Sequence, residues 1–150
     1  MKYKFADLGL SVCWCEDNLD YVCYDDIYNK KFPRGARIPT KQDWEELINK
    51  CVIAEYQNDD FSYEFIVRKR DNKNSILLSR DIGTEITGSM VYDCIYFLTS
   101  TLINDNKVYA ICFLHRENKN VEPFFTAIDR DKCCFVRLAK DFYGRKNRNK

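Results

Sequence analysis

The segment from Ala36 to Leu47 constrains the fold of this chain more than any other. Pro39 has a fixed φ angle and no N–H group, and it favours an extended conformation for the residue before it. Thr40 follows as a good helix N-cap, and Asp43 stands where a capping box usually has Glu or Gln. Apolar residues then recur on one helical face, at Trp44, Leu47, Ile48 and Cys51. The segment therefore predicts a strand that turns sharply into a helix over about 41–51.

Short apolar runs separated by polar turns make up most of the remaining chain. The runs that predict strands are 7–15, 51–56, 61–67, 75–79, 94–99, 108–114, 124–128 and 133–138. Two longer stretches, 16–36 and 80–92, lack such a pattern and predict irregular loops. One main helix, with room for a second short helix, and short, mostly antiparallel strands form an α+β pattern. The predicted fold class is therefore α+β, with long irregular loops.

Length and charge bound the organisation of the chain. A length of 150 residues predicts one domain, over 1–140. Residues 141–150 are rich in basic side chains and lack apolar periodicity, which predicts a flexible, basic C-terminal tail. The formal net charge of +1 creates no overall field for nucleic acid or for an anionic membrane. Nucleic acid is therefore disfavoured as a partner, except through phosphate contacts of the tail.

The redox state expected for the cysteines depends on the cellular compartment, which we predict from the N-terminal sequence. The chain as given has no apolar segment typical of a signal peptide, and no run approaches the ~18 apolar residues of a membrane span. We therefore expect a cytoplasmic protein without a membrane span. There the eight cysteines are expected to be mostly reduced and buried, because a free thiol packs as a small apolar group. Disulfides are the alternative in an oxidising compartment.

Catalytic and metal-binding patterns are weak throughout the sequence. His115 is the only histidine, and its place after an apolar run predicts an exposed strand end. Cys13 and Cys15 are separated by one residue, whereas thioredoxin-like and structural zinc motifs have at least two between their cysteines. The five glycines do not have the spacing of a phosphate-binding loop. The sequence therefore predicts no catalytic residue, no metal and no cofactor.

Several segments resemble one known family, in the same order along the chain. They are Asp7–Val12 with Trp14, Arg37–Leu47, Asn74–Leu78, Phe97–Thr101 and Phe135–Arg137. In these segments the chain resembles the Fibrobacter succinogenes major paralogous domain family, which is similar to the formylglycine-generating enzymes. The resemblance spans roughly residues 5–140 and implies a C-type-lectin-like fold. Relatives in that family are often exported.

The chain departs from this group of proteins at the residues that carry activity. The formylglycine-generating enzymes bind copper through a C-terminal cysteine pair, but Cys133 and Cys134 are adjacent and do not have that spacing. Sugar-binding C-type lectins hold calcium with Glu-Pro-Asn or Gln-Pro-Asp, whereas Glu122 and Pro123 are followed here by Phe124. The resemblance therefore implies neither activity for this chain.

Candidate binding residues are those of the predicted loops. We expect contacts from 16–32, 80–92 and 103–107, because loops on a rigid scaffold often carry binding sites. The chosen residues are Tyr21, Tyr24, Tyr28, Asp25, Asp26, Asn104 and Asp105. Tyrosine supplies a large contact area at low entropic cost, while the acids also fit a solvated loop that binds nothing. Residues with a structural role at the helix start are Arg37, Pro39, Thr40 and Trp44, of which Trp44 is expected in the core.

The functional hypothesis that follows is a non-enzymatic recognition domain on a C-type-lectin-like scaffold. Its ligand is expected to be a protein or a glycan, by analogy with the family, although fold alone does not fix function. One alternative is a cysteine- or copper-dependent oxidase of the formylglycine-generating type, which needs a thiol with a depressed pKa. Another is a receptor-binding protein of a phage or retroelement.

Overall fold

The computed structural model describes residues 3–17, 21–29, 31–57, 63–69, 73–78, 94–114 and 123–142. Within these ranges the chain forms twelve strands, one α-helix and one 3-10 helix. The elements are β1 (Phe5–Ala6), β2 (Val12–Cys15), β3 (Tyr21–Cys23), η1 (Tyr24–Asn29), β4 (Ala36–Arg37), α1 (Lys41–Lys50), β5 (Val52–Gln57), β6 (Tyr63–Arg68), β7 (Ile76–Leu78), β8 (Cys94–Leu102), β9 (Lys107–Leu114), β10 (Phe124–Asp129), β11 (Cys133–Phe135) and β12 (Ala139–Asp141).

The described part of the protein is mostly β, so the predicted α+β class is wrong. Its strands form three sheets, and α1 is the one α-helix within the described ranges. The second helical element, η1, is a 3-10 helix of six residues. The segment 16–36, predicted as an irregular loop, contains β3, η1 and the start of β4. The predicted loop 80–92 and His115 lie outside the described residues.

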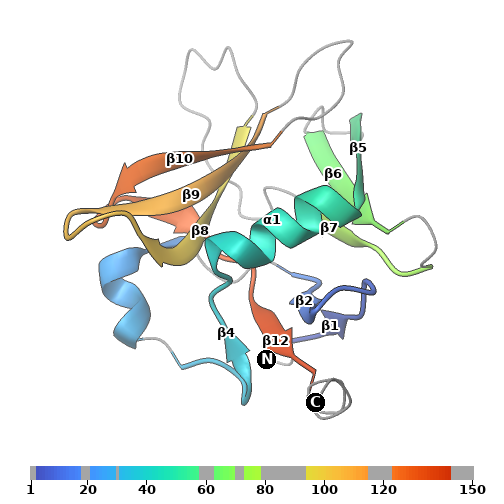
Figure 1. Ribbon diagram of the computed structural model, residues 1–150, viewed down its shortest axis with the longest axis horizontal. Helices are drawn as coiled ribbons and strands as arrows, with labels where there is room; N and C mark the ends of the chain where they lie inside the picture. Colours follow the sequence, from blue (N-terminus) through green and yellow to red (C-terminus); the bar gives the residue numbers. More distant parts are fainter. Residues whose placement is uncertain are drawn as a thin grey trace.

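The three sheets meet around α1 (Figure 1). The four-stranded sheet has the order β1-β2-β12-β4, the five-stranded sheet β10-β9-β8-β11-β3, and the three-stranded sheet β5-β6-β7. The pairings are antiparallel except for that of β11 with β8. Figure 1 shows α1 running from the side of β8 and β9 towards β5, across the middle of the molecule. Strand β12 includes Asp141, the first residue of the predicted tail, whereas 143–150 lie outside the described residues.

A capping box determines where α1 begins. The Thr40 hydroxyl accepts a hydrogen bond from the Asp43 N–H at 3.1 Å, and the Asp43 carboxylate accepts one from the Thr40 N–H at 2.8 Å. The same carboxylate pairs with the Arg37 guanidinium, which also lies 3.2 Å from a carboxylate oxygen of Asp141. Strand, cap and helix are thereby joined at one corner.

The corner is also attached to β8. The Pro39 carbonyl accepts a hydrogen bond from the Ser100 N–H at 2.9 Å. One residue on, the Lys41 N–H donates to the Thr101 hydroxyl, also at 2.9 Å. This second bond satisfies an N–H group that the first helical turn leaves without a partner within the helix. Segments about 60 residues apart in the sequence are therefore fastened together at the start of α1.

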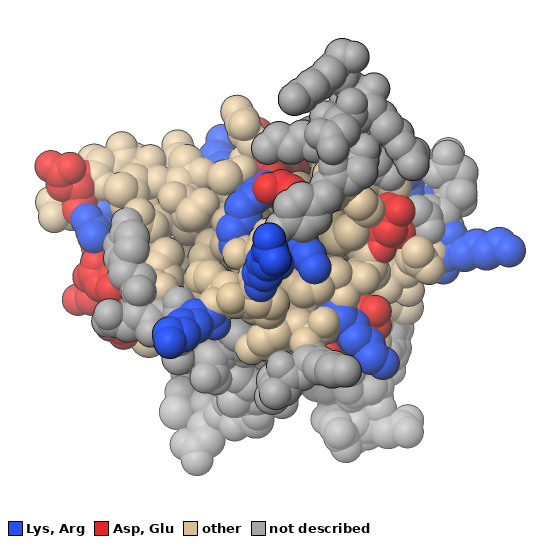
Figure 2. Space-filling view, turned by 90° about the horizontal axis from the view of Figure 1, so that it is seen from below, with Lys and Arg blue, Asp and Glu red and all other residues tan. Residues whose placement is uncertain are grey.

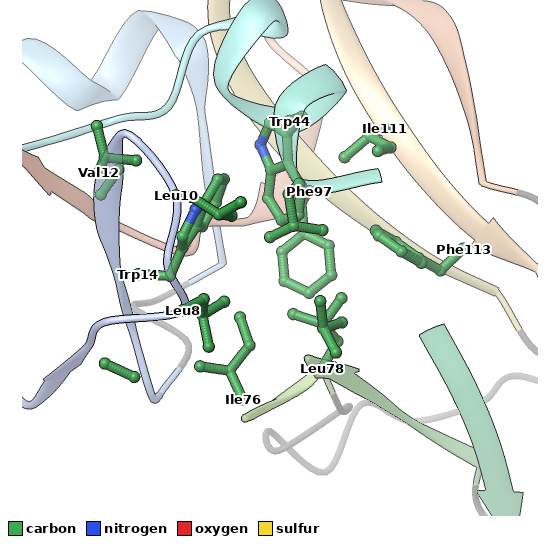
Figure 3. Packing of buried hydrophobic residues seen from close by; sticks show 14 of the residues in the cluster. Leu8, Leu10, Val12, Trp14, Trp44, Ile76, Leu78, Phe97, Ile111 and Phe113 are labelled. Atoms are coloured by element: carbon green, nitrogen blue, oxygen red, sulfur yellow. The ribbon is translucent and has the colours of Figure 1, made fainter. Parts of the chain in front are cut away.

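The main core lies where α1 meets the sheets. Trp44, expected in the core, is fully buried, and its ring centroid is 4.5 Å from that of Trp14 on β2. The same ring lies 5.3 Å from Phe97 on β8 and 5.9 Å from Phe113 on β9. Figure 3 shows the aliphatic residues Leu8, Ile76 and Leu78 below these rings. A second buried cluster, which includes Leu98 and Val136, lies on the other face of the five-stranded sheet.

Replacing Asp43 by alanine is expected to lower the free energy of unfolding by about 1–2 kcal/mol at neutral pH, because a cap and an ion pair are lost together. Burial by itself raises the pKa of Asp43, but the hydrogen bonds from Arg37 and Thr40 and the charge of Arg37 outweigh it, so the pKa is lowered. A lowered pKa contributes stability above the unfolded value of ~3.9, and this is lost as the pH falls through the folded value. Urea unfolding at neutral and strongly acidic pH should therefore show the difference from the wild type shrinking in acid.

Asp141→Ala is the matched control for this experiment. Asp141 also pairs with Arg37, but its side chain is 48 % exposed and belongs to no cap. Its removal is expected to change the stability by no more than about 0.5 kcal/mol. If Asp43→Ala lowered the free energy of unfolding by the same amount in acid, the charge of Asp43 would not be what stabilises this corner.

Candidate functional site

Two of the predicted binding loops meet at one edge of the molecule. The 3-10 helix η1 carries Asp25, and the turn between β8 and β9 carries Asp105. A third segment, the turn between β10 and β11, joins them there. Together they form an open depression of about 440 Å³, which we call the acidic depression, lined by Asp25, Asp105, Asn106, Asp129, Arg130 and Asp131. Figure 1 shows η1 and the tip of the β8–β9 hairpin on the same side of the molecule, at the left.

Arg130 holds the three segments of the acidic depression together. Its Nε donates a hydrogen bond to a carboxylate oxygen of Asp25 at 2.9 Å, and its guanidinium also donates to the carbonyl oxygen of Asp105 at 3.0 Å. The backbone repeats these links, because the Asp25 N–H donates to the Arg130 carbonyl and the Arg130 N–H donates to the Asn106 carbonyl. One residue therefore connects η1 with both turns.

The turn between β8 and β9 is preorganised by Asn104. Its side-chain oxygen accepts hydrogen bonds from the N–H groups of Asn106 and Lys107, at 2.8 and 2.9 Å. This is the local side-chain bonding for which Asn is favoured in turns. Asn104, which was predicted as a ligand contact, therefore has a structural role, because it fixes the shape of this turn at the edge of the acidic depression.

The acidic depression carries more negative than positive charge. Asp25 pairs with Arg130, and Asp129 pairs with Lys107. The carboxylates of Asp105 and Asp131 form no ion pair with any residue in the described part of the chain. The hydrogen bond from Lys107, and then its charge, lower the pKa of Asp129, which is therefore ionised at neutral pH. Figure 2 shows acidic side chains gathered at the left end of the molecule, the end where η1 and the β8–β9 tip lie in Figure 1.

Tyr24, an aromatic residue predicted as a contact, does not line the acidic depression. Tyr24 is buried, and the Arg130 guanidinium carbon lies 5.0 Å from its ring centroid. Tyr24 therefore supports Arg130 from inside the protein, as a cation–π partner. The side chains of Tyr21 and Tyr28 lie outside the described part of the structure. Asp26 is exposed, and its carboxylate accepts a hydrogen bond from the Cys23 thiol at 3.2 Å.

The third segment, the turn at 129–132, was not among the loops predicted to carry binding residues. All four residues of 129–132 carry charged side chains, in the order Asp, Arg, Asp, Lys, and this pattern indicates an exposed turn. The signal that Arg130 would organise a site was absent, because its partners are 25 and 105 residues away in the sequence. Only the pairing of β10 with β9 and of β11 with β3, within one sheet, brings it next to them.

Among the described residues, the cysteines whose pKa is shifted do not have the depressed pKa that the oxidase alternative requires. Cys133 is exposed, whereas its neighbour Cys134 is buried, as expected for successive residues of a strand. Burial, and then the nearby Cys133, raise the pKa of Cys134 to about 12. Burial, and then Glu46, raise the pKa of Cys51 to about 11. These pKa values move away from those of reactive thiols, which are depressed.

In the ranges that the structure describes, no three His, Cys, Asp or Glu side chains are grouped so that they could hold a metal ion. Neither helix in those ranges has the length and apolar character required to cross a membrane.

Comparison of the chain with known proteins found no match among protein-family models, curated proteins or solved structures. The resemblance to the Fibrobacter succinogenes major paralogous domain family therefore remains a prediction from the sequence segments alone.

Proposed function

We propose that this protein is a non-enzymatic binding domain that recognises a basic segment of a protein ligand through the acidic depression. The observation that carries the proposal is the arrangement around Arg130, which joins three distant segments into one rim. Among the described residues, the carboxylates of Asp105 and Asp131 on this rim have no ion-pair partner. Such a rim is formed before the ligand arrives, which reduces the entropic cost of binding.

The charge of the site favours a cationic ligand group. Asp105 and Asp131 contribute negative charge that no described residue pairs, next to two acids that are paired within the protein. A lysine or arginine of a partner can form ion pairs with such carboxylates, and charge complementarity raises the rate of association. A glycan, the other ligand class expected for the chain, would offer hydroxyl groups and gain little from the excess charge. A protein ligand with exposed lysines or arginines is therefore the better fit.

The test uses two peptides of equal length, one rich in Lys and Arg and one in which these are replaced by Glu. Fluorescence anisotropy with the full chain is expected to show binding of the basic peptide only, weakening as salt is added. The double variant Asp105→Asn/Asp131→Asn is expected to weaken that binding about tenfold, because two charges that face the ligand are removed.

The matched control is Asp17→Asn/Asp141→Asn, which changes the net charge by the same amount at exposed positions outside the acidic depression. It is expected to bind the basic peptide almost as well as the wild type. Equal losses in the two double variants would show that only the overall charge matters, and the proposed site would be wrong. Binding of neutral glycans on an array, insensitive to salt and to Asp105→Asn/Asp131→Asn, would also contradict the proposal.

A further inference from the structure

Strands β3 and β11 place two cysteines directly opposite each other. In this antiparallel pair Cys23 is in register with Cys133, Val22 with Cys134, and Tyr21 with Phe135. Opposed residues of an antiparallel pair have side chains on the same face of the sheet, with Cα atoms about 4.5–5.5 Å apart. This separation lies within the range of roughly 4.4–6.8 Å that disulfides require. Both residues are free thiols in the structure.

We propose that Cys23 and Cys133 are a redox site that forms a reversible cross-strand disulfide by exchange with a small disulfide such as glutathione disulfide. This proposal does not depend on the ligand of the acidic depression.

The two thiols have different environments, which indicates the order of the reaction. Cys133 is exposed and can be reached by a small disulfide. Cys23 is only 6 % exposed, and its thiol donates a hydrogen bond to Asp26 at 3.2 Å. Burial, and then this hydrogen bond, raise the pKa of Cys23, so it stays protonated at neutral pH. Cys133 is therefore the first thiol to react, and Cys23 is the second.

The exchange is balanced in two steps. The Cys133 thiolate, after losing its proton to solvent, attacks one sulfur of glutathione disulfide, whose S–S bond breaks and releases one glutathione thiolate. Cys23 then passes its proton to the Asp26 carboxylate, and its sulfur attacks the Cys133 sulfur of the mixed disulfide. The second glutathione thiolate leaves, Asp26 releases its proton to solvent, and solvent protonates both released thiolates. The chain loses two electrons, and glutathione disulfide is reduced to two molecules of glutathione.

Geometry distinguishes this pair from the neighbouring cysteine. Cys134 is opposite Val22 in the register and faces the buried cluster on the other side of the sheet. It cannot reach Cys23 without reversing the strand. Formation of the disulfide also removes the hydrogen bond between Cys23 and Asp26, at the start of η1.

The experiment equilibrates the full chain in glutathione buffers that range from reducing to oxidising, under native conditions. The chain is then unfolded so that the buried thiols also react, free thiols are alkylated, and the digested chain is analysed by mass spectrometry. The expected result for the wild type is the loss of two alkylatable thiols of the eight, a linked peptide that joins Cys23 to Cys133, and full recovery with dithiothreitol. Cys134→Ser, the matched control from the same strand, is expected to form the same linked peptide.

The variant Cys23→Ser tests the second step. Its hydroxyl can still donate to Asp26, while the attacking sulfur is gone, so a mixed disulfide of Cys133 with glutathione should persist. In the wild type this mixed disulfide should be transient. The proposal is overturned if wild-type Cys133 keeps its glutathione, if the linked peptide joins a different pair, or if all thiols remain alkylatable in the oxidising buffer. The wild-type peptide map decides the matter even if Cys23→Ser does not fold.

Discussion

Replacement of Arg137 by alanine is expected to lower the free energy of unfolding by about 3–5 kcal/mol, from lost hydrogen bonds and lost packing together. Arg137 is fully buried between β11 and β12. Its guanidinium donates to the carbonyl oxygen of Cys15 at 3.1 Å and to that of Leu77 at 2.6 Å. The guanidinium carbon also lies 5.9 Å from the ring centroid of Phe97. One side chain therefore contacts β2, β7 and β8, which belong to three different sheets.

The size of the expected stability loss follows from the hydrogen-bond acceptors and the empty volume that alanine leaves at position 137. Two carbonyl oxygens lose their donors, and each such loss costs about 1–3 kcal/mol when the group is buried. The volume of a long side chain is also emptied at the junction of the sheets. Lysine cannot repair the site, because a single ammonium group lacks the fork that spans two carbonyls. Arg137→Lys is therefore expected to lose most of the same stability.

Urea unfolding followed by far-UV circular dichroism measures this loss. Arg68→Ala is the matched control, because Arg68 is an exposed arginine on β6 and its removal should change the stability by no more than about 0.5 kcal/mol. A loss below about 1 kcal/mol in Arg137→Ala would show that the sheets are held together without this side chain.

The second large effect is expected at Trp44, where alanine should lower the free energy of unfolding by about 3–5 kcal/mol. The indole is fully buried on α1 and packs against the rings of Trp14, Phe97 and Phe113 (Figure 3). These rings come from β2, β8 and β9, and the helix contacts two sheets through this one residue. A cavity in their midst cannot be filled by a small movement of the helix, because its start is bonded to β8.

Trp44→Phe separates the volume of the side chain from its aromatic contacts. Phenylalanine keeps a ring in the cluster and is expected to cost less than half as much as alanine. It also removes the indole N–H, which has no hydrogen-bond partner among the described residues and whose burial is unfavourable. Gln42→Ala, at an exposed position of the same helix, controls for changes in helix propensity. Circular dichroism is the suitable probe, because these substitutions alter tryptophan fluorescence. A Trp44→Phe variant as unstable as Trp44→Ala would contradict this account.

Several local features could be predicted because neighbouring residues determine them. The start of α1 depends on Pro39, Thr40 and Asp43, which act on one another within a few residues. The strands predicted over 61–67 and 75–79 are present as β6 and β7, which pair in antiparallel register. Alternating apolar residues decide which face of such strands is buried, and this pattern is local as well.

The fold class was predicted wrongly because the strands that change it are short and pair over long distances. Strand β3 has three residues and pairs with β11, while β4 has two and pairs with β12. Strands of this length have no detectable periodicity, and their sequences resemble loops. They exist because a partner more than 100 residues away supplies their hydrogen bonds.

The candidate site likewise combines features that the sequence determined with features that only the tertiary structure decided. By itself the sequence determined which residues stand in polar turns, including Asp105, because turn residues follow local backbone preferences. It did not determine η1, which carries Asp25 in a segment predicted as an irregular loop. Tertiary structure alone decided that these turns meet, that Arg130 joins them, and that Tyr24 lies buried beneath it. The same is true of the register that sets Cys23 against Cys133. The physical reason is that such contacts depend on the pairing of distant strands, which the packing of the whole core selects and no short segment encodes.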